Sequence, residues 1–216
     1  IEDEKPAEKP TEDWLNKWKK RTQEFTDEDA LKLWGKVLAG EFASPGKYSY
    51  KFLDWLNSIT PKDAQIISKL MENVFEDFYY RDNEKNSLTY DELLILQELG
   101  VIQGAESIGI EVTYKTSVTN AFQKVLLSAS RKKLLLVKHL DSTKELKISN
   151  LCCLTRIGNE VKQLCNVDTN YDMIQKLGKY IAKQGFDVFY ADVTSIANNR
   201  INFASLKKIE ANQSTN

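Results

Sequence analysis

Histidine, cysteine and long apolar runs are scarce in this chain, and each scarcity excludes a class of protein. The 216 residues include one histidine and three cysteines. A sole histidine, His139, cannot supply the multi-histidine ligand set of a typical zinc site, so we expect no metal and no other cofactor. An odd number of cysteines does not form a disulfide framework. We therefore expect Cys152, Cys153 and Cys165 to be buried free thiols in a cytosolic protein.

Charge and hydropathy indicate neither a membrane protein nor a strongly basic one. No run reaches the eighteen apolar residues of a membrane span, and no secretory signal pattern is present. The formal net charge of −1 gives no overall attraction to nucleic acid. Four Trp, nine Tyr and nine Phe indicate a folded chain. The sequence begins with Ile1 and not Met, and we expect it to be a piece of a longer protein.

No familiar catalytic or phosphate-binding motif is present, so we assign no catalytic residue and expect a protein that is not an enzyme. Gly40 to Gly46 has the wrong spacing for a phosphate-binding loop, and Lys47 is followed by Tyr48 in place of Ser or Thr. A nucleophile pair of His139 with one of the cysteines stays open as an alternative. Titratable groups that converge in a deep pocket would favour an enzyme.

Capping residues and apolar periodicity predict helices from residue 12 to about residue 100. The helix that ends at Ala43-Ser44-Pro45-Gly46 is expected to bury one face. That face is formed by Leu31, Trp34, Leu38 and Phe42 and widened by Leu33 and Val37. The helix that begins at Pro61 is expected to reach Tyr80. The predicted caps are Thr11, Thr26, Ser49, Thr60 and Thr89.

Beyond Gly100 the sequence predicts strands over 108–115, 122–129 and 133–140, two helices over 155–165 and 169–184, and a closing strand pair. The order of a helix ending "LQELGVI", a hairpin, and a helix "LTRIGNEV" is typical of winged-helix proteins. In such folds the hairpin contacts phosphates, while the helix before it enters the major groove. Asp91, Glu92 and Glu98 make that helix acidic, which favours a protein contact over DNA binding. The nucleic-acid contacts predicted by the alternative are Arg131, Lys132, Lys133 and Lys138.

The predicted fold class is α+β, mainly α, with an N-terminal helical bundle followed by a winged-helix-like α+β part. The predicted domains are a flexible tail over 1–11, the bundle over 12–100, the winged-helix-like part over 101–209 and a flexible tail over 210–216.

The stretch "LWGKVLAGEFASPGKYSYKFLDWLNSITPKDAQIISKL" resembles the hallmark of a bacterial family of domains of unknown function, number 2806. The similarity extends over roughly residues 25–165, and Gly35 stands where the family pattern has Ala. A shorter part is similar to the abortive-infection alpha family, which implies a role in phage defence. The matching residues are Leu33, Trp34, Lys36, Leu38, Ala39, Gly40, Glu41, Pro45, Gly46, Tyr48, Ser49 and Ala64.

We predict a non-enzymatic interaction module with a protein partner and no membrane partner, which senses or binds a partner in phage defence if the resemblance holds. The alternative is a winged-helix-type regulator that binds nucleic acid. Glu41 is expected to be a structural clamp, through Lys47 or through amides of the next helix. Trp14 and Trp18 could pack on a second subunit, which leaves a homo-oligomer open.

Overall fold

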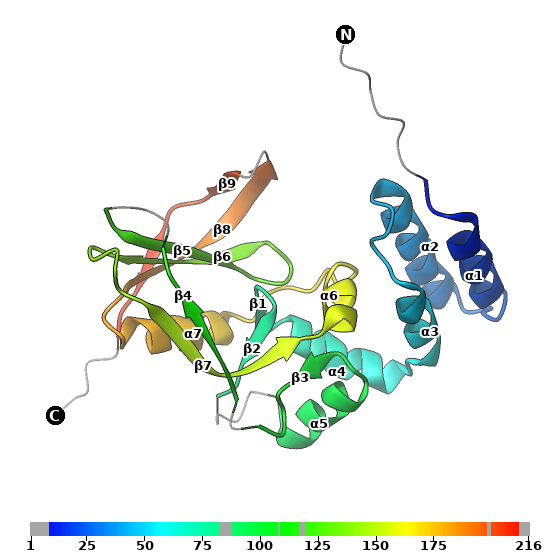
Figure 1. Ribbon diagram of the computed structural model, residues 1–216, viewed down its shortest axis with the longest axis horizontal. Helices are drawn as coiled ribbons and strands as arrows, with labels where there is room; N and C mark the ends of the chain where they lie inside the picture. The colour runs from blue at the N-terminus through cyan, green and yellow to red at the C-terminus, as the bar shows by residue number, and fades with distance from the viewer. Residues whose placement is uncertain (1–8, 83–87, 108, 117–119, 198–199, 212–216) are drawn as a thin grey trace, which may run out of the picture. The chain divides into compact units, whose positions relative to one another are not determined.

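The computed structural model describes residues 9–82, 88–107, 109–116, 120–197 and 200–211 (Figure 1). The chain divides into two compact units, Ile1–Ala64 and Gln65–Asn216. The division falls inside α4 (Pro61–Met71), whereas the predicted domain boundary was residue 100. The tails predicted over 1–11 and 210–216 lie mostly outside the described residues.

The described part of the first unit contains three complete helices with side-chain caps at their N-termini, followed by the start of α4. Thr11 and Ser49 accept backbone N–H groups at the starts of α1 and α3, as their position before an apolar segment predicts. The cap of α2 is Asp27, one residue beyond the predicted Thr26. The helices are α1 (Glu12–Thr22), α2 (Glu28–Ala43) and α3 (Tyr50–Ser58).

The buried face of α2 differs from the predicted one. Trp34 and Val37 are buried as expected, and Glu41 completes their face. Leu31 and Phe42 are 42% and 52% exposed. The ring of Trp34 packs on that of Phe25, and its backbone carbonyl accepts from the indole of Trp18. These contacts are made by residues outside α2, so the periodicity of α2 did not reveal which stripe faces inward.

The second unit is built on two antiparallel five-stranded sheets. Sheet A has the order β1-β2-β7-β3, and β4 also pairs with β7. Sheet B has the order β10-β8-β6-β5, and β9 also pairs with β8. The strands of sheet A are β1 (Val74–Phe75), β2 (Phe78–Tyr80), β3 (Ile102–Gln103), β4 (Ile110–Tyr114) and β7 (Leu146–Leu154). Those of sheet B are β5 (Phe122–Leu127), β6 (Lys133–His139), β8 (Asp187–Ala197), β9 (Arg200–Phe203) and β10 (Lys207–Ile209).

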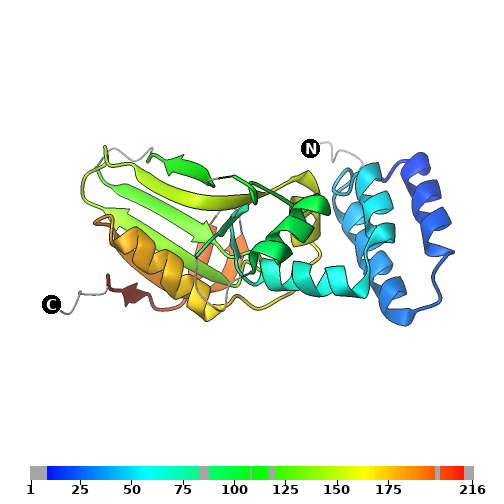
Figure 2. The same ribbon diagram turned by 90° about the horizontal axis from the view of Figure 1, so that it is seen from below.

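Three further helices accompany these sheets. They are α5 (Tyr90–Glu98), α6 (Arg156–Lys162) and α7 (Tyr171–Ala182). Helix α7 lies along sheet B, as both views show (Figures 1 and 2). Gly178 permits this close approach, because a Cβ there would lie 2.4 Å from Cδ1 of Ile209 in β10. The ring of Tyr180 in α7 contacts that of Tyr80 in β2, with centroids 4.9 Å apart, so α7 touches both sheets.

The predicted fold class, a mainly α chain with a helical bundle and a winged-helix-like part, is wrong. The helix predicted to reach Tyr80 ends at Met71, and the chain turns at Glu76, whose φ is 52°, to form β1 and β2. Residues 65–100 therefore belong to the unit that carries the sheets.

The winged-helix arrangement fails for a topological reason. The strand that follows α5 is β3, which pairs with β7 in sheet A. The hairpin predicted to be the wing, β5–β6, lies in sheet B, where β6 also pairs with β8. Helix α5 therefore leads into a strand of sheet A, whereas the hairpin lies in sheet B, so the two do not form one DNA-reading unit.

Candidate functional site

The resemblance residues of the first unit form a corner around a buried carboxylate. Glu41 is only 2% exposed, and its two carboxylate oxygens accept from the backbone N–H groups of Gly46, at 2.5 Å, and Tyr48, at 2.9 Å. The indole Nε1 of Trp14 donates to the carbonyl of Tyr48 at 2.8 Å. Gly40 leaves room for the ring of Tyr48, because a Cβ there would lie 2.8 Å from Cε2 of that ring. Glu41 is thus a clamp on backbone amides of the turn before α3.

Other residues in and near the resemblance segment make contacts inside the first unit or lie at turns and helix ends. The Nζ of Lys47 lies 5.4 Å from the ring centroid of Tyr48. The indoles of Trp14 and Trp18 donate to carbonyls inside the unit, and packing of these residues on a second subunit stays an open alternative. Ser49 caps α3, Gly46 has a φ of 83°, Leu33, Leu38 and Pro45 are half-buried, and Ala39 is exposed.

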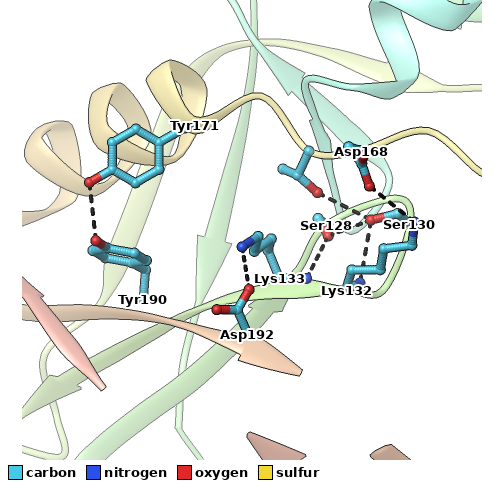
Figure 3. A network of polar contacts seen from close by, with 9 residues as sticks. Ser128, Ser130, Lys132, Lys133, Asp168, Tyr171, Tyr190 and Asp192 are labelled. Carbon is cyan, nitrogen blue, oxygen red and sulfur yellow. Dashed lines mark hydrogen bonds and ion pairs between the residues drawn. The ribbon is translucent and has the colours of Figure 1, made fainter. Parts of the chain in front are cut away.

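The four basic residues predicted to contact nucleic acid lie on or beside the β5–β6 hairpin. Its turn is held by hydroxyl groups (Figure 3). Ser128 Oγ accepts from the N–H of Lys133, and Ser130 Oγ accepts from the N–H of Lys132. The Ser130 hydroxyl also lies 3.1 Å from that of Thr169, in the segment before α7. Side chains from two distant parts of the sequence therefore fix this turn.

Acidic partners offset much of the positive charge of the hairpin. Lys132 pairs with Asp168 at 3.0 Å, and Lys133 pairs with Asp192 in β8 (Figure 3). Lys138 lies over the ring of Phe189, with Nζ 6.0 Å from its centroid. A phosphate group would have to compete with two carboxylates for these lysines, which weakens electrostatic binding of a polyanion.

A tyrosine pair beside this hairpin was not predicted. The hydroxyls of Tyr171 in α7 and Tyr190 in β8 lie 3.1 Å apart, and their rings meet edge to face (Figure 3). The hydrogen bond with Tyr190 raises the pKa of Tyr171 above its usual value. The pair exists because α7 packs on sheet B, and no local pattern in the sequence signals that contact.

Titratable groups also gather near the turn between β1 and β2. The Nζ of Lys162 donates to the carbonyl of Glu76 at 2.6 Å, and burial lowers the pKa of this lysine. Burial, with Asp77 nearby, raises the pKa of Cys153. Burial raises the pKa of Cys152 to about 11. Both thiols thus resist ionisation, whereas a cysteine nucleophile needs a lowered pKa.

The side chain of His139 makes contacts with two neighbours. Its Nδ1 accepts from the backbone N–H of Asp141 at 3.0 Å, and its ring contacts that of Phe186. In the described part of the chain, no three His, Cys, Asp or Glu side chains gather in a way that could hold a metal ion.

The face of sheet B turned away from α7 is apolar, and we call it the outer face. Register pairs Leu134 with Ala191 and Leu136 with Phe189, so these side chains point to one side, opposite to Tyr190 and Ile209, which meet α7. Exposed apolar side chains extend the face onto the β8–β9 ribbon, where Ile196 is 37% and Phe203 is 39% exposed. Around the buried Leu134, Leu136 and Ala191 pack the partly buried Val125, Leu127, Phe189, Val193, Ile201 and Leu206.

Comparison with known proteins gives a family match for the first part of the chain alone. Residues 1–76 match the model of a family described as "Protein of unknown function (DUF2806)". The resemblance predicted over residues 25–165 is therefore supported up to residue 76, and similarity to the abortive-infection alpha family is not shown. No curated protein and no solved structure matches the chain. Among the described helices, none has the length and apolar character needed to cross a bilayer.

Proposed function

We propose that this chain is a non-enzymatic protein-interaction module that binds its partner through the outer face of sheet B. The observation that carries the proposal is the set of apolar side chains left accessible on this face, where Val193 and Ile201 are partly buried and Ile196 and Phe203 are 37% and 39% exposed. Large exposed apolar patches on folded proteins commonly mark interaction sites.

The composition of the outer face fits a protein partner. Leu134 and Leu136 are already covered within the chain, and the side chains left accessible around them are aliphatic and aromatic, among them Val193, Phe189 and Phe203. Charged residues lie at one end, where Lys138 pairs in register with Asp187. An apolar centre with a charged rim is the usual anatomy of a protein interface.

The test is affinity capture with tagged chains from cell extract. Ile196→Lys combined with Phe203→Lys places two charges on the outer face, and we expect this variant to lose the proteins that the wild type retains. Tyr90→Lys is the matched control, because Tyr90 in α5 is 57% exposed but lies off the face. Circular dichroism checks that each variant is folded. Retention of the same proteins by the double variant would contradict the proposal.

Phage defence, as the biological setting of this module, stays a prediction. The family match carries no stated role, so the setting depends on the resemblance alone. Capture from phage-infected and uninfected extracts in parallel tests it, with a partner specific to infection as the expected result. The same partners in both extracts would count against it.

Nucleic-acid binding also stays a prediction, as the alternative function. It requires salt-sensitive retardation of duplex DNA or RNA, lost when Arg131, Lys132 and Lys133 are replaced by Gln. The ion pairs of Lys132 and Lys133 with Asp168 and Asp192 favour the protein-interaction proposal over this one.

A further inference from the structure

We infer that Tyr171 and Tyr190 form an oxidative modification site, at which a one-electron oxidant derived from peroxide joins the two rings as an intramolecular dityrosine. The inference does not depend on the proposed function of the outer face, because this pair lies on the opposite side of sheet B, where α7 packs. It is carried by the geometry of the two phenols and by their access to solvent.

The two phenol groups approach each other through the parts of the rings that react in such a coupling. Their hydroxyl oxygens lie 3.1 Å apart, and the ring centroids lie 5.6 Å apart with the ring planes inclined by 72° (Figure 3). Dityrosine forms between the ring carbons next to the two hydroxyl-bearing carbons, so contact between the hydroxyls brings the reacting edges together. Two reactants held in this way couple far faster than two that must meet by diffusion.

The reaction balances with hydrogen peroxide as the final oxidant. Each phenol loses one electron and its hydroxyl proton, and becomes a tyrosyl radical. The two radicals combine in one carbon–carbon bond, and the hydrogens on the newly bonded carbons move to the oxygens as both rings regain aromaticity. The two electrons and two protons released reduce one hydrogen peroxide to two water molecules. Because Tyr171 is the first residue of α7 and Tyr190 lies in β8, the new bond ties the start of this helix to sheet B.

Solvent access and hydroxyl direction distinguish this pair from a second pair of tyrosines in the described part of the chain. Tyr171 is 52% exposed, so an oxidant in solution reaches the Tyr171–Tyr190 pair. The rings of Tyr80 and Tyr180 are closer, with centroids 4.9 Å apart, but both residues are half-buried. The hydroxyl of Tyr180 accepts from the backbone N–H of Ser149 at 3.3 Å. This hydroxyl is thus directed at the backbone, whereas those of Tyr171 and Tyr190 are directed at each other.

The test is treatment of the whole chain with hydrogen peroxide and a catalytic amount of a haem peroxidase. A chain concentration of about 1 μM favours coupling within one chain over coupling between chains. We expect dityrosine fluorescence in the monomeric fraction, an intact mass lower by two hydrogen atoms, and one cross-linked peptide that joins positions 171 and 190. No dityrosine in the monomeric fraction, or a cross-link between other positions, would overturn the inference.

Two variants that each remove one phenol of the pair, Tyr171→Phe and Tyr190→Phe, should reduce the yield of intramolecular dityrosine about tenfold. The matched control is Tyr180→Phe, which removes a phenol of the closer pair from the same helix and should keep the wild-type yield. Circular dichroism checks that each variant is folded. An undiminished yield in either variant of the pair, or an equal loss in Tyr180→Phe, would contradict the assignment of this site.

Discussion

The corner of the first unit and the β5–β6 turn of the second are both sharp reversals held by side chains, but their determinants lie at different distances in sequence. In the corner, Glu41 accepts from amides five and seven residues further along the chain. In the β5–β6 turn, Ser130 contacts Thr169, 39 residues away, and Lys133 pairs with Asp192, 59 residues away. The Glu41 clamp can be understood from one short segment, with support from Trp14 at a distance, whereas the turn combines local hydroxyl bonds with contacts to distant segments.

The largest expected effect is at Gly158, in the unit whose structure depends on distant contacts. A Cβ there would lie 2.1 Å from the carbonyl oxygen of Val101, which is backbone and cannot rotate away. We expect Gly158→Ala to lower the free energy of unfolding by about 3 kcal/mol. Urea denaturation measures this, and a loss below about 1 kcal/mol would show that α6 is held less tightly than described.

The next largest effect on stability is expected at Glu41, whose carboxylate holds the corner. Glu41→Gln replaces one acceptor oxygen by an NH₂ group that faces a backbone donor, so a buried N–H loses its partner. We expect a loss of about 2 kcal/mol in the free energy of unfolding. Glu28→Gln is the control, because Glu28 lies in the same helix with its side chain 89% exposed. Equal effects at both positions would contradict the clamp.

A smaller effect, dependent on pH, is expected at Glu92 in α5. Burial raises the pKa of Glu92, but the hydrogen bonds from Lys69 and from the backbone N–H of Thr89 outweigh it, so the net pKa is lowered. Because the folded pKa is lowered, the stabilisation is present at neutral pH and is lost as pH falls through the folded pKa.

Glu92→Gln should therefore lower the free energy of unfolding by about 1 kcal/mol at neutral pH, through the capping box and the ion pair. The difference in the free energy of unfolding between the variant and the wild type should disappear at pH values below the ordinary titration range of glutamate. Thermal midpoints measured across this pH range test it, and a gap independent of pH would point to packing and not to charge.

The smallest effect is a gain in stability at Gly35, in the helix of the corner. A Cβ at this position meets nothing within 4 Å. The pattern that this stretch resembles has Ala there. We expect Gly35→Ala to raise the free energy of unfolding by about 0.5–1 kcal/mol, because Gly costs more conformational entropy in a helix. A lower free energy of unfolding, measured by urea denaturation, would mean that position 35 in α2 does not tolerate a side chain.

The fold could be predicted from the sequence where its determinants are local. Thr11, Ser49 and Thr89 were predicted as helix caps, and each side chain accepts a backbone N–H at the start of a helix. The segment around Val74 was wrongly predicted as helix, because its strand state depends on a pairing that periodicity does not reveal. In β2, Phe78 pairs with Cys153, far along the chain.

The same distinction applies to the candidate sites. The hairpin turn that carries Arg131 was placed correctly between two strands. Its ion pairs could not be predicted, because Asp168 lies 36 residues from Lys132 and approaches it only when the segment before α7 is in place. The outer face of sheet B was missed for a related reason. Its residues come from β5, β6, β8 and β9, and only the register of these strands brings them to one side.

The most direct test of the central claim, that the outer face and not the basic hairpin is the interaction surface, is affinity capture with two variants from one extract. One variant carries Ile196→Lys and Phe203→Lys, and the other carries Gln at 131, 132 and 133. We expect the first to lose the captured proteins and the second to retain them. Loss by the hairpin variant alone, especially if nuclease treatment of the extract also abolishes capture, would contradict this account and favour nucleic-acid binding.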